Sequence, residues 1–292
     1  MTQGLLGARE RRGPLVFVAV AFGLVVLLCV PAMAGLDANY LVIATPIAQW
    51  IPALAVLLAV GVRRRRESLS VTWRMRPVRG TPTRSVIGLV TAAILLVPAI
   101  HVSLGMGLGL VEWTPVPDMF SIVPLILPIA LLALLSAIGE EVGWRGYLWT
   151  RIRHRTGFWV TAFVIGLIWS AWHLPVLLVY GVQDDIAWRN VAATAVDLVA
   201  ASFVLGAGRE LSGTVWPAAW GHALVNSVLV FTSSSLVTQD VFLDDASFWQ
   251  YRALGWAAWL VAAGMLVAVG AATTRSREPA RPGRQSSRPT RS

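Results

Sequence analysis

Two adjacent glutamates, Glu140 and Glu141, follow a long apolar run that contains no charge. The run, SIVPLILPIALLALLSAIG, occupies residues 121–139. A lone charge at the centre of a bilayer costs at least about 2.5–3.5 kcal/mol, so a chain keeps one there when the charge is paired, hydrated or used. A carboxylate beside a bound water can take a proton from it, which makes general-base chemistry the first hypothesis for this pair.

The sequence GEEVGWRGYLW at residues 139–149 predicts different roles for the two carboxylates. Glu141 and Arg145 are four residues apart, so they share a helix face and can form an ion pair. Glu140 projects about 100° away and cannot use the same arginine equally well. We therefore expect Glu141 to help hold the fold and Glu140 to be available as the general base. The alternative is a buried ion pair that only fixes the helix.

A second apolar segment, IWSAWHLP at residues 168–175, contains His173. A lone histidine in an apolar helix is often a structural residue whose imidazole is satisfied locally. Inside a membrane, an ionisable residue is instead a functional-site hypothesis by default. The neighbouring Trp169 and Trp172 are expected to pack between helices.

A third segment, WPAAWGHALVNS at residues 216–227, contains His222 and Asn226. These residues are four apart, so they line one helix face, and both side chains offer N–H donors. Two donors aimed at one point can stabilise an oxyanion, and loss of one such donor typically lowers the rate by about 10²–10³. The alternative is a hydrogen-bonded pair between helices.

Taken in order, the three motifs resemble those of the CPBP family, which comprises the type II CAAX prenyl endopeptidases and their bacterial relatives. That family shows EExxxR, FxxxH and HxxxN on three successive helices. The corresponding segments here are Glu140-Glu141-Val-Gly-Trp-Arg145, Trp169-Ser-Ala-Trp-His173 and His222-Ala-Leu-Val-Asn226. The resemblance covers about residues 115–235, and Trp169 stands where the family usually has phenylalanine.

The resemblance implies an intramembrane endopeptidase. Glu140 and His173 would hold and activate a water, and His222 and Asn226 would stabilise the tetrahedral oxyanion. Glu141 would support the site through its arginine partner, with proton transfer as a further candidate role.

No cofactor is favoured. The sequence lacks HExxH, the zincin signature. Members of the family are often described as metalloproteases, and a zinc site remains the alternative, with His173, His222 and Glu140 or Glu141 as three ligands around an open position.

Composition indicates a polytopic membrane protein. Of the 292 residues, 56% are hydrophobic and 13% are charged, whereas soluble domains are typically about 25% charged. The net charge of +9 comes from arginine alone. The arginines cluster in tails and short loops, which favours membrane orientation over nucleic-acid binding. The single cysteine, Cys29, excludes an intramolecular disulfide and a multi-cysteine metal site.

Runs of about 20 apolar residues are long enough to span a bilayer as helices. We therefore expect an all-α bundle of about eight transmembrane helices, in which Pro46 and Pro52 favour a kink in the second. The expected spans are 14–34, 41–62, 85–110, 120–149, 158–180, 189–207, 216–236 and 249–272.

The loop charges predict the orientation. Arginines precede the first span, follow the second and fourth, occur as Arg209 after the sixth, and fill the tail, while the other loops are acidic. Arginine-rich loops stay in the cytoplasm, so both termini are expected there, in a multi-pass protein of the bacterial inner (cytoplasmic) membrane. The expected parts are a basic N-terminus (1–13), a membrane domain (14–272) with its catalytic core at about 115–235, and a disordered basic tail (273–292).

The sequence thus predicts an endopeptidase that cleaves a peptide or protein substrate, membrane-anchored or not, near the cytosolic face of the lipid bilayer. Nucleic acid is not an expected partner. Besides the zinc-dependent version, the alternatives are a non-catalytic membrane binding or immunity protein and a proton-coupled transporter. A transporter requires a continuous polar path, and the nearly apolar stretch Ser121–Leu135 argues against one.

Overall fold

The computed structural model describes residues 2–60, 72–76, 82–183, 188–238 and 243–275. These residues form helices and no β-strand; one isolated β-bridge joins Trp113 and Val237. The all-α prediction is therefore confirmed.

In chain order the elements are α1 (Thr2–Met33), α2 (Asn39–Ala48), α3 (Ile51–Val60), α5 (Thr83–Gly107), α6 (Met119–Ile122), the 3₁₀ turn η2 (Val123–Leu125), α7 (Ile126–Glu141), the π-helix η3 (Val142–Leu148), α8 (Trp149–Arg153), α9 (Phe158–Gln183), α10 (Trp188–Ser212), α11 (Trp216–Leu224), the π-helix η4 (Val225–Leu229), α12 (Val230–Ser235) and α13 (Asp245–Arg275).

Six helical segments of the described chain are long and apolar enough to cross a membrane. They are Gly13–Met33, Thr83–Gly107, Met119–Arg153, Phe158–Val182, Trp188–Ser212 and Asp245–Thr273. The chain is therefore a multi-pass membrane protein. The bent pair α2 and α3, which meets at 45°, makes a seventh span if it is counted as one. The remaining predicted span, 216–236, is helical over Trp216–Ser235, but it is not among the apolar spans because it carries His222, Asn226 and several hydroxyl side chains.

Several predicted boundaries differ from the observed ones. The first helix begins at Thr2, so the N-terminal segment is helical as well as basic. Arg209 was assigned to a loop but lies inside α10, which continues to Ser212. The predicted kink in the second span occurs between α2 and α3, beside Gln49. The tail is helical to Arg275, and the predicted disorder beyond it lies outside the described residues.

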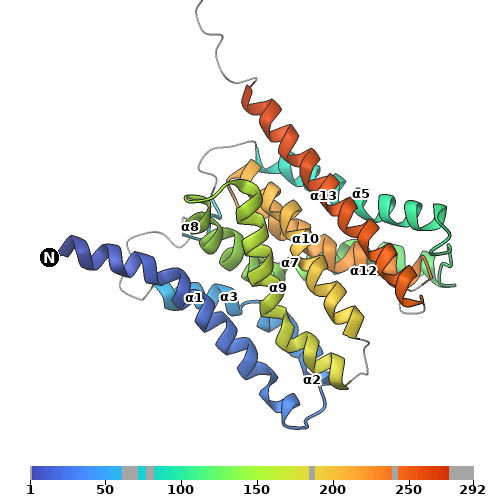
Figure 1. Ribbon diagram of the computed structural model, residues 1–292, viewed down its shortest axis with the longest axis horizontal. Helices are drawn as coiled ribbons and strands as arrows, with labels where there is room; N and C mark the ends of the chain where they lie inside the picture. Colours follow the sequence, from blue (N-terminus) through green and yellow to red (C-terminus); the bar gives the residue numbers. More distant parts are fainter. Residues whose placement is uncertain (1, 61–71, 77–81, 184–187, 239–242, 276–292) are drawn as a thin grey trace, which may run out of the picture.

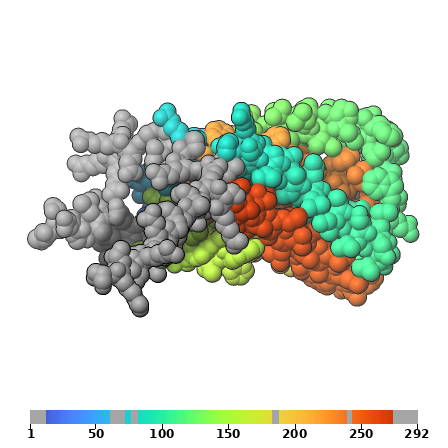
Figure 2. All heavy atoms as spheres, turned by 90° about the horizontal axis from the view of Figure 1, so that it is seen from above, coloured from blue at the N-terminus to red at the C-terminus, as the bar shows by residue number. Residues whose placement is uncertain are grey.

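Figure 1 shows α1 and α13 on opposite sides of the bundle, with α9 and α10 between them. Helices α9 and α10 pack against each other, α11 packs on α7, and α1 packs on α3 and α9. Helix α13 lies along α5 (Figure 2) and also contacts α10. Burial of aromatic side chains from η3, α8 and α9 forms the middle of the main core, which includes Trp144, Tyr147, Trp149, Trp169 and Trp172.

Large apolar side chains point outward along the spans. On α7 the exposed fractions of Leu131, Leu132 and Leu135 are 51%, 69% and 60%. Exposed leucine is unfavourable in water but suits contact with lipid chains, since a bilayer is as apolar as these side chains. The outer face of α7 thus faces hydrocarbon, while its last turn carries two glutamates into the protein interior.

Candidate active site

The glutamate pair ends α7, and the helix then widens into the π-helix η3. The amide of Trp149 bonds to the carbonyl of Trp144, five residues back. Within η3, the carbonyl of Arg145 accepts a hydrogen bond from Nε of Arg209 on α10 at 2.9 Å, and Arg209 is 7% exposed. The widened turn is therefore stabilised by an arginine from a neighbouring helix, and π-helical turns of this kind are frequent at functional sites.

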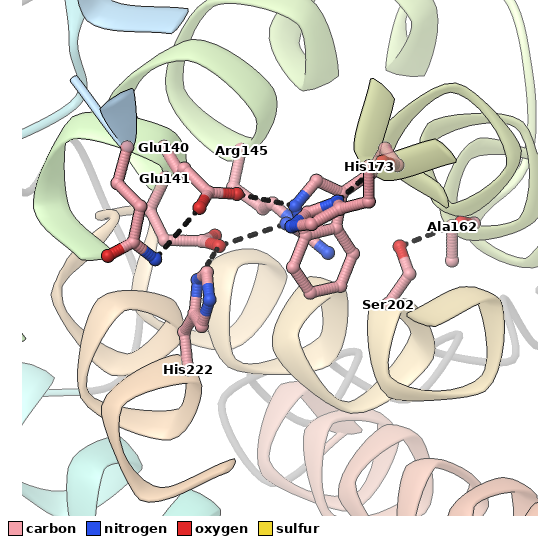
Figure 3. A network of polar contacts seen from close by, with 9 residues as sticks. Glu140, Glu141, Arg145, Ala162, His173, Ser202 and His222 are labelled. Carbon is pink, nitrogen blue, oxygen red and sulfur yellow. Dashed lines mark hydrogen bonds and ion pairs between the residues drawn. The ribbon is translucent and has the colours of Figure 1, made fainter. Parts of the chain in front are cut away.

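The predicted ion pair between Glu141 and Arg145 is present and fully buried. Arg145 Nη1 lies 2.9 Å from Glu141 Oε1, and neither side chain is exposed. The same carboxylate oxygen lies 3.0 Å from Nδ1 of His222 on α11. Because the ionised Glu141 carboxylate can only accept hydrogen bonds, Nδ1 of His222 is the donor in this contact. Glu141 therefore joins two helices as well as holding its arginine (Figure 3).

Glu140 occupies a separate environment, as its position on the helix predicted. Its Oε1 accepts a hydrogen bond from Gln49 Nε2 at 2.9 Å, and its Oε2 accepts one from the indole of Trp169 at 2.6 Å. The residue is fully buried. The imidazoles of His173 and His222 both interact with its charge. Glu140 is thus an ordered carboxylate, and no arginine of the described residues is hydrogen-bonded to it.

Trp169 lies in the middle of this group. Besides donating to Glu140, its ring stands edge-on to His173 and His222, with centroids 5.5 and 5.2 Å apart. The guanidinium of Arg145 lies over the same ring, 4.3 Å from its centroid, in a cation–π contact. Trp169 therefore contacts every charged or ionisable member of the site except Glu141.

His173 is half-buried on α9. Its Nδ1 lies 2.9 Å from the carbonyl oxygen of Trp169, one turn earlier. Since a carbonyl only accepts, Nδ1 carries the proton, and in the neutral ring Nε2 is an acceptor. His222 Nδ1 is likewise committed as a donor. The local bond predicted for a structural histidine is therefore present at His173, yet it leaves the second ring nitrogen available.

Asn226 lies apart from the other predicted residues. It is exposed, and it makes no side-chain hydrogen bond to the described part of the chain. The π-helix η4 begins at Val225, between His222 and Asn226, so the helix is wider at this turn than the α-helical spacing assumed. Its oxyanion role remains a prediction.

A glycine face brings Gln49 to Glu140. A Cβ on Gly139 would stand 2.7 Å from the backbone oxygen of Gln49 and from Cα of Trp50. A Cβ on Gly143 would stand 2.5 Å from Cβ of Pro52. Only glycine allows the break between α2 and α3 to approach the helix this closely. The break therefore forms one wall of the site.

The metal hypothesis does not fit the side-chain arrangement. Among the described residues, no three His, Cys, Asp or Glu side chains are arranged to hold a metal ion. Three of the four carboxylate oxygens of Glu140 and Glu141 have bonds to nitrogen donors. The fourth, Glu141 Oε2, is buried and has no hydrogen-bond partner among the described residues. Nε and Nη2 of Arg145 are also buried without such a partner.

Sequence reasoning did not find two members of the site. Gln49 is a polar residue inside an apolar segment, between Pro46 and Pro52. Its unusual position was the feature of the sequence that could have indicated a role in the site. Trp169 was expected to be a packing residue. Its spacing of four residues from His173 placed both side chains on one helix face. Its role as a donor to Glu140 depends on a contact between two residues that are 29 positions apart in sequence, on different helices.

Comparison with known proteins points to one family. Residues 122–228 match the family described as Type II CAAX prenyl endopeptidase Rce1-like, and this segment contains all seven motif positions. Over 69 residues, the chain is 32% identical to CAAX prenyl protease 2 of Methanococcus maripaludis. The aligned part is 22% of this chain and 26% of the relative, so the chain spans about a quarter of that protein's length.

The three motifs occur in order within the matched segment, and their Glu, Arg and His residues meet in one buried network. The segment 122–228 is therefore similar to the type II CAAX prenyl endopeptidases.

Proposed function

We propose that the protein is an intramembrane endopeptidase of the CAAX type that hydrolyses a peptide bond with a water activated by Glu140. The observation that carries the proposal is the buried Glu140 carboxylate, which accepts hydrogen bonds from Gln49 and Trp169 and has no ion-pair partner among the described residues. Its location inside the segment matched to an endopeptidase family supports the same reaction class.

The first step is activation of the water. Glu140 and the free Nε2 of His173 are both acceptors, so each can take one hydrogen of the same water. The water then presents a lone pair to the substrate carbonyl. As its oxygen adds to the carbonyl carbon, one proton passes to Glu140. Glu140 and His173 therefore have the roles in water activation that the motifs predicted.

The second step needs a donor for the oxyanion that forms on the carbonyl oxygen. Nδ1 of His222 is committed to Glu141, so Nε2 is the nitrogen that can face the oxyanion. Nε2 carries a hydrogen only in the imidazolium form, and the adjacent Glu141 carboxylate stabilises that positive charge. Asn226 is the second predicted donor. Collapse of the intermediate breaks the C–N bond, and Glu140 returns its proton to the leaving amine.

The test is a cleavage assay on purified protein reconstituted in liposomes. The substrates are a peptide library that includes C-terminal CAAX peptides with and without a prenyl group, and products are read by mass spectrometry. The wild type is expected to cut, whereas Glu140→Ala and His222→Ala are expected to lose cleavage while remaining folded. Glu112→Ala and His154→Ala are matched controls because both side chains are exposed and outside the site.

Each alternative gives a different result in the same preparation. Equal cleavage by Glu140→Ala and wild type would remove Glu140 as the base. Loss of wild-type activity on chelation, restored by zinc, would support the metal-dependent version. A proton-driven flux across the liposome membrane, with no cleavage of any peptide, would favour a transporter.

A further inference from the structure

The Glu140 carboxylate is held at both of its oxygens by neutral N–H donors from two different helical elements. Gln49 Nε2 donates to Oε1 at 2.9 Å from the break between α2 and α3. Trp169 Nε1 donates to Oε2 at 2.6 Å from α9. One donor would leave the carboxylate free to turn about its last bond, whereas two donors on opposite oxygens fix its plane.

We propose that Trp169 and Gln49 are positioning residues that fix the Glu140 carboxylate in the orientation needed to accept a proton from water. The proposal rests on the proposed function, in which Glu140 is the base. Each carboxylate oxygen has two acceptor positions, so one bond to a protein donor leaves the other for the water. Neutral donors suit this task, because they orient the carboxylate without the strong charge pairing that Arg145 gives to Glu141.

Trp169 is the more important of the two. Its bond to Glu140 is the shorter, and hydrogen bonds to ionised groups are stronger than neutral ones. The indole itself is held in place, since its ring packs against His173 and His222 and lies under the Arg145 guanidinium. Phenylalanine, the residue of the family pattern, could make the ring contacts but has no N–H to donate. The tryptophan thus gives this chain a donor that the pattern itself does not provide.

Gln49 is held by backbone contact. Gly139 lets the Gln49 carbonyl and Trp50 lie directly on α7, one residue before Glu140. The side chain of Gln49 therefore reaches the carboxylate from a fixed backbone position.

Trp169→Phe is the decisive variant because it keeps an aromatic ring and removes only the indole donor. We expect kcat to fall by roughly 10- to 100-fold with little change in KM, as loss of a hydrogen bond to a charged group predicts. Gln49→Leu should lower kcat by a smaller factor. The matched control is Trp220→Phe on α11, which removes an indole bond to Thr91 Oγ1 of 2.8 Å and does not touch Glu140.

A spectroscopic readout tests the bond without relying on activity. The wild-type minus Trp169→Phe difference in ultraviolet resonance Raman spectra isolates the Trp169 indole, whose N–H band should report a strong hydrogen bond. In a Glu140→Ala background the same difference should shift to a weakly bonded position. An unshifted band, or a kcat for Trp169→Phe equal to that of Trp220→Phe, would overturn the proposal. A wild type that cuts no peptide would instead refute the proposed function, and the Raman comparison would still decide whether the bond exists.

Discussion

Replacement of Arg145 by leucine tests how the protein keeps a carboxylate inside its apolar core. The arginine Nη1 lies 2.9 Å from Glu141 Oε1, and both side chains have no exposed surface. Leucine fills part of the volume but leaves Glu141 with His222 as its remaining side-chain partner among the described residues. The variant also removes the cation from the face of Trp169.

The expected cost follows from burial. Removing one partner of a fully buried ion pair destabilises a protein by about 3–5 kcal/mol, because the other charge stays buried without its counterion. The pair between Arg153 and Glu210 has a similar separation, 2.9 Å, but its side chains are 37% and 38% exposed. An exposed pair contributes only about 0–1 kcal/mol. Arg153→Leu is therefore the matched control, and the two variants should differ by several kcal/mol.

The assay is reversible unfolding in mixed micelles, followed by tryptophan fluorescence as the fraction of denaturing detergent rises. We expect Arg145→Leu to unfold at a much lower fraction than Arg153→Leu. The double variant Glu141→Gln, Arg145→Leu should be more stable than Arg145→Leu alone, because no uncompensated charge is left. Equal stability of Arg145→Leu and Arg153→Leu would refute the reasoning, since it would mean that Glu141 is not a buried charge in the folded protein.

Three further outcomes follow from the structure. Gly139→Ala is expected to lower both stability and cleavage, because its Cβ would collide with the backbone between α2 and α3, whereas Gly88→Ala has open space and should gain up to about 1 kcal/mol in thermal unfolding. Arg209→Leu removes the side-chain donor to the carbonyl of Arg145 in η3. It should lower the free energy of unfolding by about 1–3 kcal/mol in the same measurement. A hydrogen bond from Ser247 lowers the pKa of Asp244 below its ordinary value. Ionised Asp244 caps the start of α13 by accepting this bond, so the stability that it gives to the helix is present above the ordinary pKa and is lost as the pH falls through the lowered pKa. Amide hydrogen exchange in the first turn of α13 should detect this loss. Asp244→Asn should remove the pH dependence.

Local rules predicted the parts of the site that lie on one helix. The bond between Glu141 and Arg145 follows from a spacing of four residues in a helix, so the sequence sufficed. The same rule was applied to His222 and Asn226, and there the helix widens into η4 at Val225, which the sequence did not indicate. A π-helix depends on packing around it and has no simple periodic signature.

Contacts between distant segments were out of reach. The bonds of Glu140 to Gln49 and of Glu141 to His222 span 91 and 81 residues, and no pattern in the sequence states which helix faces meet. The apolar runs predicted six spans well because length and composition decide them. The segment at 216–236 was harder to assign, because the polar residues that make it a candidate for chemistry also make it less apolar.

The two π-helices have a consequence for how this protein can vary. Each begins next to a motif residue: η3 directly follows Glu141, and η4 starts three residues after His222. A turn with a surplus residue is what a one-residue insertion into a regular helix would leave. It lets the segment beyond it rotate relative to the segment before it. Removing one residue from either turn would therefore rotate the segment that follows the turn relative to the motif residue that precedes it.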